Sequence, residues 1–251
     1  MNDSIGMFAY NIPFASIFLM MISAIITPLL PNKNRIPEKL SCVMIGIVGV
    51  LSACLLYALT AGGQSLSFNF MMGHFPAPWG NELRAGPLEA VLSLVFCTAM
   101  LLSLTGNLSS TAEDIPPKRC NIFCVLVNLL TASLLALTYT NDLFTAYVFI
   151  EINTIAACAI VAVKESPETV RAALRYLIMS LVGSGLVMIA ICLLYDLTGH
   201  LLMQDMSRAI HGLVASKSYM MPLTVSLALI TAGLAIKSAL YPFASWLPDA
   251  H

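Results

Sequence analysis

Residues 143–163 read LFTAYVFIEINTIAACAIVAV, an apolar run that carries one charged side chain, Glu151. A helix rises 1.5 Å per residue, so about 20 apolar residues cross the hydrocarbon core of a membrane. The run has this length and predicts a membrane-spanning helix. A carboxylate inside such a helix is costly in lipid, which makes Glu151 a candidate functional residue.

Six more apolar stretches of similar length accompany this one, at residues 12–30, 40–61, 88–105, 121–140, 172–197 and 222–244. The chain is 59% hydrophobic and only 10% charged, with a mean hydropathy of +0.87, whereas soluble domains carry roughly a quarter charged residues. These values predict an all-α integral membrane protein of about seven transmembrane helices, with the lipid bilayer as its solvent. The net charge of −1 and the absence of any Lys/Arg run argue against nucleic acid as a partner.

The positive charges of the connections alternate between two sides. One set of connections carries eight and the other three, namely Lys33, Arg35, Lys39, Lys118, Arg119, Lys164, Arg171 and Arg175 against Arg84, Arg208 and Lys217. Because Lys and Arg collect on the cytoplasmic side, the pattern predicts a multi-pass protein with its N-terminus outside and its C-terminus in the cytoplasm. We expect its location to be the cell inner (plasma) membrane. The twelfth basic residue, Lys237, falls inside the last stretch.

Glu151 and Lys237 are therefore the two charges predicted at membrane depth, where each costs about 2.5 to 3.5 kcal/mol on insertion scales. By helical rise, Glu151 lies about 12 Å and Lys237 about 22 Å from the start of its span, an offset of about 10 Å if the spans are level. A direct ion pair then requires staggered helices or a bridging water, and the sequence leaves this open. Tyr147 and Thr154 add a narrow polar stripe on the helical face of Glu151.

Two interpretations of the pair stay open. The pair is a proton relay if burial and mutual attraction have balanced, opposing effects on the protonation of the lysine. A lysine balanced in this way can exchange its proton as its partner approaches or leaves. The pair is a structural clamp if the two charges only set the register of the helices. Pro242 favours the relay if it interrupts the last span, since an interrupted helix beside a charge is a common way to build an ion site. The alternative is that Pro242 simply ends that span.

Other site chemistries find no support in the sequence. The seven cysteines are interpreted as small buried hydrophobes, and Cys120 and Cys124, although they share a helical face, do not complete a metal site. We therefore expect neither a metal nor a cofactor. A nucleophile–base set and a phosphate-binding glycine loop are also missing, so we expect no catalytic chemistry of the chain's own. Gly183, Ser184 and Gly185 predict a close-packing face between helices.

Two stretches resemble a known family. Residues 141–151 contain NDLF and FIE, and residues 237–251 read KSALYPFASWLPDAH. They resemble the proton-antiporter family, which comprises the antiporter-like subunits of NADH:quinone oxidoreductase, of membrane-bound hydrogenases and of multisubunit Mrp-type sodium/proton antiporters. Residues 75–80 and the run Arg175-Tyr176-Leu177 look most like the D-type subunit of the Mrp and hydrogenase branch. Ala244 departs from the pattern, because the family often has histidine there.

The resemblance implies the N-terminal half of an antiporter-like subunit, with residues 1–119 as an N-terminal three-helix segment and residues 120–251 as the start of the antiporter-like helical repeat. It implies that Glu151 and Lys237 are the family's proton-relay pair, in a subunit that translocates protons or exchanges sodium for protons.

Such a subunit would work within a multisubunit membrane complex, such as a translocase of the NADH:quinone oxidoreductase or hydrogenase type. The partners expected are other membrane subunits, including a chain that supplies the C-terminal half if the subunit is split or truncated. The rival expectation is a non-conducting membrane scaffold subunit of a respiratory or hydrogenase complex.

Overall fold

The computed structural model describes residues 6–31, 35–61, 66–72, 75, 80–106, 115–116, 119–164 and 166–250. Within these residues, seven helices are long and apolar enough to cross a membrane, which confirms the predicted fold class. They span Phe8–Leu29, Ile36–Thr60, Pro87–Gly106, Cys120–Tyr139, Leu143–Ala162, Pro167–Thr198 and Met220–Lys237. Lys33, Lys118, residues 76–79 and His251, all named above, lie outside the described residues.

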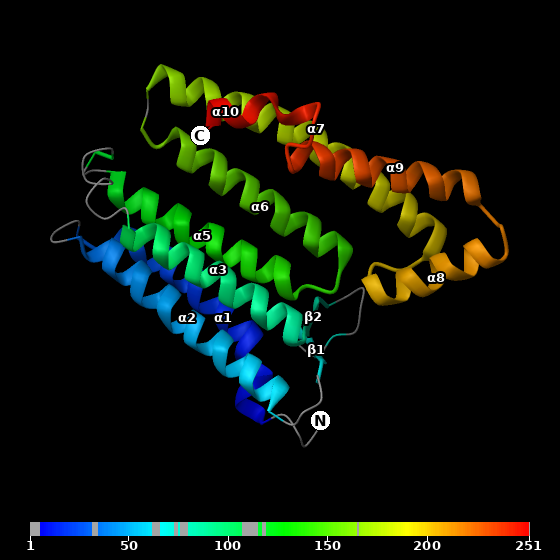
Figure 1. The fold of residues 1–251 in the computed structure, drawn as a ribbon, viewed down its shortest axis with the longest axis horizontal. Helices are drawn as coiled ribbons and strands as arrows, with labels where there is room; N and C mark the ends of the chain where they lie inside the picture. The colour runs from blue at the N-terminus through cyan, green and yellow to red at the C-terminus, as the bar shows by residue number, and fades with distance from the viewer. Residues whose placement is uncertain are drawn as a thin grey trace. The chain divides into compact units, whose positions relative to one another are not determined.

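The chain divides into two compact units, the first formed by residues 1–70 and 83–139. Its helices are α1 (Met7–Ile26), the 3-10 turn η1 (Thr27–Leu29), α2 (Ile36–Thr60), α3 (Pro87–Gly106) and α5 (Cys120–Tyr139). In this unit α1 packs on α2 and α5, and α2 packs on α3 (Figure 1). The fully buried Asn128 of α5 joins α1 by donating to Ser23 Oγ at 3.1 Å and Thr27 Oγ1 at 3.2 Å.

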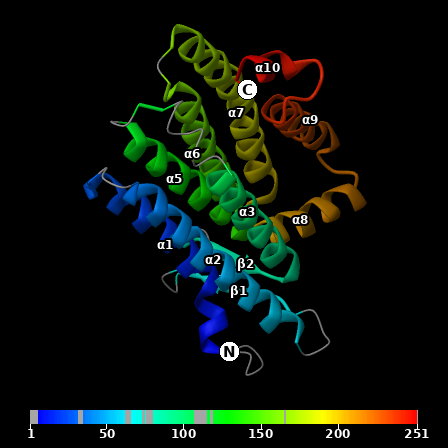
Figure 2. The same cartoon turned by 60° about the vertical axis from the view of Figure 1, so that its left-hand side comes forward.

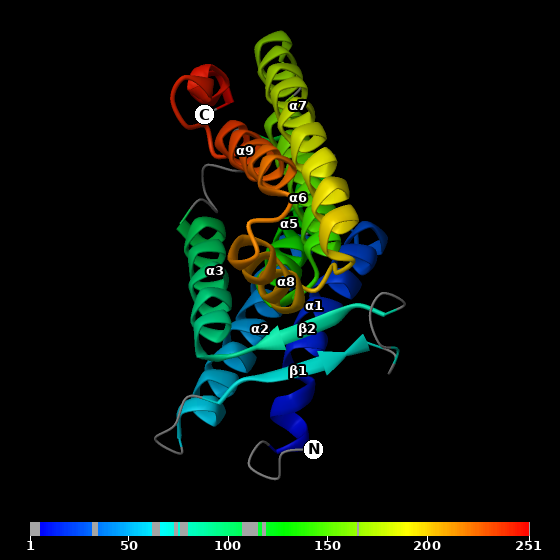
Figure 3. The ribbon, with the colours of Figure 1, turned by 90° about the vertical axis from the view of Figure 1, so that its right-hand side faces the viewer.

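A two-stranded sheet of β1 (Phe68–Met71) and β2 (Glu82–Ala85) lies in the connection between α2 and α3 (Figure 3). The sequence pattern predicted only helices, because four-residue strands are too short to give a clear alternation. Tyr10 of α1 packs against β1, with its ring centroid 5.2 Å from that of Phe68 and 5.1 Å from that of Phe70.

The second unit contains residues 71–82 and 140–251. It holds α6 (Leu143–Ala162), α7 (Pro167–Thr198), α8 (Met203–Ala215), α9 (Met220–Lys237), the 3-10 turn η4 (Phe243–Trp246) and α10 (Leu247–Ala250). The long α7 packs along both α6 and α9 (Figure 2). The short α8 packs its Met206 against Leu194 of α7 and Leu223 of α9, so it ties the two helices together at the end where α9 begins.

The helix of the seventh span ends earlier than Pro242. Helix α9 ends at Lys237, and the predicted range 222–244 is therefore too long by seven residues. A proline ring clashes with the carbonyl four residues before it, which for Pro242 is that of Ser238, and proline also disfavours helical geometry at the preceding residue. Ala239 has a positive φ of 51°, and the chain regains helical turns only at Phe243.

A glycine contact sets the approach of α7 to α9. A Cβ built on Gly183 would lie 2.9 Å from the carbonyl oxygen of Gly233, and a Cβ on Gly233 would lie 2.6 Å from that of Gly183. Only glycine, whose side chain is a hydrogen atom, fits at both positions at this separation of the two helices. The predicted close-packing role therefore holds at Gly183, whereas a Cβ on Gly185 would meet nothing within 4 Å.

Helix α5 belongs to the first packed unit, and the second unit resumes at Thr140. The predicted division at 119/120 concerns the start of the antiporter-like repeat rather than packing, and it stays a prediction.

Candidate functional site

Glu151 and Lys237 form a direct ion pair inside the second unit. Lys237 Nζ lies 2.9 Å from Glu151 Oε1, and the two side chains are only 10% and 21% exposed, with the lysine the more buried of the two. The offset of about 10 Å expected from level spans is absent because the helices are staggered. The sequence allowed contact through staggered helices or through a bridging water. The structure has the staggered arrangement, so no bridging water is needed.

Hydroxyl groups from α6 and α7 complete the surroundings of the pair. Lys237 Nζ donates to Thr154 Oγ1 at 3.1 Å, and Thr154 in turn donates its only hydrogen to the carbonyl of Ile150 at 2.9 Å. Thr154 is therefore held as an acceptor for the lysine. On the other side, Ser184 of α7 donates to Glu151 Oε1. Both charges thus have a hydrogen-bond partner besides each other, which lowers the cost of burying them.

Lys237 is also the last residue of α9. The C-terminal end of a helix carries a partial negative charge from its unpaired carbonyl groups, and a cation is favoured there. The break at Ser238 places this helix end beside the pair. The ammonium of Lys237 therefore lies between the carboxylate of Glu151 and the C-terminal end of its own helix.

The hydroxyl groups extend along one face of α7. Tyr176, Ser180 and Ser184 recur every four residues, and the Tyr176 hydroxyl lies next to the side chains of Ser180 and Thr154. The ring of Tyr176 stacks on Trp246 of η4, with centroids 4.5 Å apart and planes at 22°. The segment that follows the break is thus in contact with the polar face that leads to the pair.

The start of α6 is held in several ways, which places Glu151 two turns further on. Asp142 accepts a hydrogen bond from the backbone N–H of Thr145 at 2.6 Å, so it caps the helix as expected for an anion at an N-terminus. Asn141 donates from its side chain to Glu82 Oε1 at 2.9 Å and accepts at its carbonyl from the N–H of Met203 at 2.8 Å.

Part of this site was missed by sequence reasoning. The sequence pattern assigns Ser184 only a packing role, and it places Tyr176 and Trp246 only in stretches that resemble a family. A usable signal was present, because hydroxyl residues at 176, 180 and 184 line one helical face of an otherwise apolar span.

The first unit holds two further features, a contact between a thiol and a carboxylate and an apolar pocket. Cys120 donates its thiol hydrogen to Glu38 Oε1 at 3.0 Å, and Glu38 also lies 3.8 Å from Arg35. Among the described residues, no group of three His, Cys, Asp or Glu side chains is arranged to hold a metal ion.

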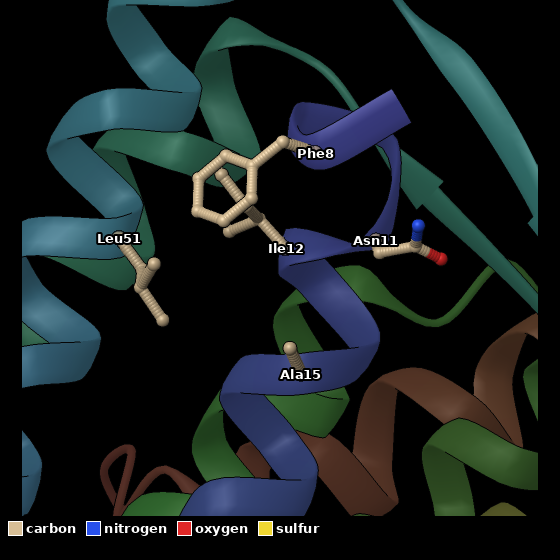
Figure 4. A pocket seen from close by; sticks show the side chains of 5 residues that line it. All are labelled: Phe8, Asn11, Ile12, Ala15 and Leu51. Atoms are coloured by element: carbon tan, nitrogen blue, oxygen red, sulfur yellow. The ribbon is translucent and has the colours of Figure 1, made fainter. Parts of the chain in front are cut away.

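The second feature is a pocket of about 430 Å³ beside α1, to which α2 contributes one side chain. Four of its five lining side chains are apolar, and Asn11 is the exception; the lining residues are Phe8, Asn11, Ile12, Ala15 and Leu51 (Figure 4). This lining offers no ionisable group, so the pocket is no alternative to the pair as a site for proton chemistry.

Sequence comparison matches the second unit to a known family. The family described as NADH:quinone oxidoreductase/Mrp antiporter, transmembrane, matches residues 140–251. NADH-quinone oxidoreductase subunit N of Desulforudis audaxviator is 34% identical over 214 residues, which cover 81% of this chain and 41% of that protein. The D-type subunit of the Na(+)/H(+) antiporter of Bacillus subtilis is 26% identical over 243 residues, covering 96% and 47%.

Solved structures agree on the fold. A chain of the membrane-bound sulfane sulfur reductase, an archaeal respiratory membrane complex, superposes with a TM-score of 0.83 at 24% identity, covering 96% of this chain and 47% of that one. A chain of the Mrp complex from Dietzia sp. superposes with a TM-score of 0.79 at 18% identity, covering 98% and 44%.

The protein spans less than half the length of these relatives. The match begins at Thr140, where the second packed unit resumes, and it includes both Glu151 and Lys237. Residues 140–251 match the NADH:quinone oxidoreductase/Mrp antiporter family, and the relatives that cover 81% and 96% of this chain are named as subunits of NADH-quinone oxidoreductase and of an antiporter, as the resemblance predicted.

Proposed function

We propose that this protein is a proton-translocating membrane subunit of a multisubunit complex, and that Glu151 and Lys237 exchange the proton. The observation that carries the proposal is the direct contact of the two buried charges, 2.9 Å apart between α6 and α9. A charged group inside a membrane span is expensive, and two of them in contact form a site whose protonation is coupled.

The coupling supplies a cycle that balances in protons. A proton that reaches the Glu151 carboxylate neutralises it and removes the attraction that holds the proton on Lys237. The Lys237 ammonium then releases its proton to an acceptor further along the path, and the neutral amine takes the proton from Glu151. The ion pair is restored, and one proton has passed.

The hydroxyl face of α7 supports a route for that proton. Thr154 contacts Lys237 directly, and Tyr176 lies beside Thr154 and against Trp246. Hydroxyl groups both donate and accept hydrogen bonds, so a row of them can pass a proton together with water.

The membrane and the partners follow from the same proposal. Relatives named as subunits of NADH-quinone oxidoreductase and of antiporters indicate a subunit that works with other membrane subunits. We propose the cell inner (plasma) membrane, with the N-terminus outside and the C-terminus in the cytoplasm, because of the uneven distribution of Lys and Arg. Sequence that corresponds to the remaining length of the relatives would supply the rest of the path, in continuation of this chain or in another one.

Replacing Lys237 tests the proposal. In membrane vesicles that contain the assembled complex, Lys237→Ala should abolish proton transport and leave the amount of assembled subunit measurable by blotting. Lys39→Ala is the matched control, since Lys39 is an exposed lysine near the start of α2, and it should transport normally. Normal transport by Lys237→Ala would refute the relay and favour a non-conducting scaffold.

A further inference from the structure

We propose that Ser184 is a positioning residue for Glu151, holding the carboxylate through Oε1 so that Oε2 is the atom that takes up and releases the proton. This inference rests on the proposed relay and assigns a role within it to a residue of α7. Ser184 lies in the middle of the helix and is only 3% exposed.

The two donors to Glu151 converge on one oxygen. Ser184 Oγ donates to Oε1, and Lys237 Nζ lies 2.9 Å from the same atom. A carboxylate oxygen has about two lone-pair sites, so both sites of Oε1 are occupied. Among the residues that the structure describes, none donates to Oε2. A proton that arrives at the carboxylate therefore finds its free site on Oε2.

The group that accepts the hydrogen bond of the Ser184 hydroxyl depends on whether Glu151 is ionised. Its hydroxyl carries one hydrogen, and besides Glu151 Oε1 the carbonyl of Ser180 lies within 2.8 Å of Ser184 Oγ. An ionised carboxylate is the stronger acceptor, because charge-assisted hydrogen bonds are roughly twice as strong as neutral ones. The hydrogen thus points to Glu151 when that residue is ionised, and it can turn to Ser180 once Glu151 is protonated. Neither state leaves the buried hydroxyl without a partner.

The backbone holds Ser184 in place independently of Glu151. Its neighbour Gly183 touches Gly233, and Gly233 lies one helical turn before Lys237. The same contact therefore brings the hydroxyl of α7 and the ammonium of α9 to the one carboxylate of α6. Ser184 does not depend on the ion pair for its position, which is the property a positioning residue needs.

The consequence is a shift in the pH dependence of transport. Among the described residues, the charged and titratable groups that interact with Glu151 include Lys237 from α9, Tyr176 from α7, and Tyr147 on α6 itself. Ser184 adds a neutral donor that favours the ionised carboxylate over the protonated one. Without it, the hydrogen bond from Ser184 to the Glu151 carboxylate is lost. The acidic limb of the transport profile should then move upward by about one pH unit, the size expected for a lost charge-assisted hydrogen bond to a carboxylate.

The experiment compares variants of Ser184 in vesicles with the assembled complex. Ser184→Ala and Ser184→Cys remove or weaken the donor, and Cys keeps most of the volume, so both should shift the acidic limb upward. Ser184→Thr keeps a hydroxyl and should restore the original profile. Ser226→Ala is the control, because Ser226 is a fully buried serine of α9 that donates only to the carbonyl of Pro222 among the described residues, at 2.8 Å.

Infrared difference spectra provide a second measurement, which a change in packing alone does not alter. The band of the protonated Glu151 carboxyl, assigned by its loss in Glu151→Gln, should persist to higher pH in Ser184→Ala. An unchanged limb and an unchanged band in both Ser184→Ala and Ser184→Cys would overturn the proposal. If the two Ser184 variants are unchanged and Lys237→Ala abolishes transport, only the role of Ser184 is refuted. If Lys237→Ala transports normally, the relay itself fails.

Discussion

Neutralising the pair in two steps separates a relay from a structural clamp. Glu151→Gln keeps the shape of the side chain but leaves the Lys237 ammonium, which is 10% exposed, without its counter-ion. Lys237→Met likewise leaves the Glu151 carboxylate without its counter-ion. At 2.9 Å the Coulomb attraction is about 6 kcal/mol for an effective dielectric constant near 20. Desolvation offsets part of it, and removing one partner of a buried pair costs about 3 to 5 kcal/mol in practice.

The double variant Glu151→Gln/Lys237→Met should recover that stability, because no unpaired charge remains and replacement of both partners is often neutral or stabilising. The measurement is the free energy of unfolding of the detergent-solubilised complex for the parent, both single variants and the double variant. Proton transport is measured on the same four proteins in vesicles. We expect the two single variants to be destabilised and inactive, and the double variant to be stable and inactive.

Two results would refute the reasoning. A double variant that is stable and transports protons would mean that the charges only clamp the helices. Single variants with unchanged stability would mean that water or another charge compensates each partner, contrary to the closed contact seen between Glu151 Oε1 and Lys237 Nζ.

The remaining predictions concern the contacts that support the pair. Gly183→Ala would bring a Cβ to 2.9 Å from a carbonyl of α9, so overpacking should cost about 1 to 3 kcal/mol and reduce transport. Gly185→Ala, whose Cβ meets nothing within 4 Å, should be nearly silent, and equal effects of the two in unfolding and transport assays would contradict the glycine contact. Trp246→Ala should remove the stacking on Tyr176, worth about 0.5 to 1.5 kcal/mol, and speed hydrogen exchange in residues 243–250. Trp246→Phe should preserve most of the protection, and an unchanged exchange rate in Trp246→Ala would show that the stack does not hold the segment.

Most of the helical fold could be predicted from the sequence. A stretch of apolar residues long enough to cross a membrane has few other stable structures, since every backbone polar group must be satisfied internally in lipid. Six of the seven spans therefore appear within five residues of their predicted ends; α1 and α7 each begin five residues earlier than predicted, at Met7 and Pro167. The small sheet of β1 and β2 and the early end of α9 were not predictable in the same way, because both depend on local geometry over only a few residues.

Glu151 and Lys237 could also be identified from the sequence, since any charge at membrane depth stands out by its cost. Ser184 and Tyr176 could be placed on one helical face from the sequence but not assigned to the pair, because a hydroxyl in a span is inexpensive and most often bonds to its own helix, as Ser226 does. What distinguishes Ser184 is the carboxylate opposite it, and that carboxylate belongs to another helix.

The sequence by itself therefore determined the seven spans and the two buried charges, because each follows from the local cost of placing polar groups in an apolar helix. Only the tertiary structure decided that the charges touch. Their contact depends on the stagger of α9 against α6, which is set by the approach of Gly183 to Gly233 and by the short α8 between α7 and α9. Such contacts join residues far apart in the chain, and no local pattern encodes their register.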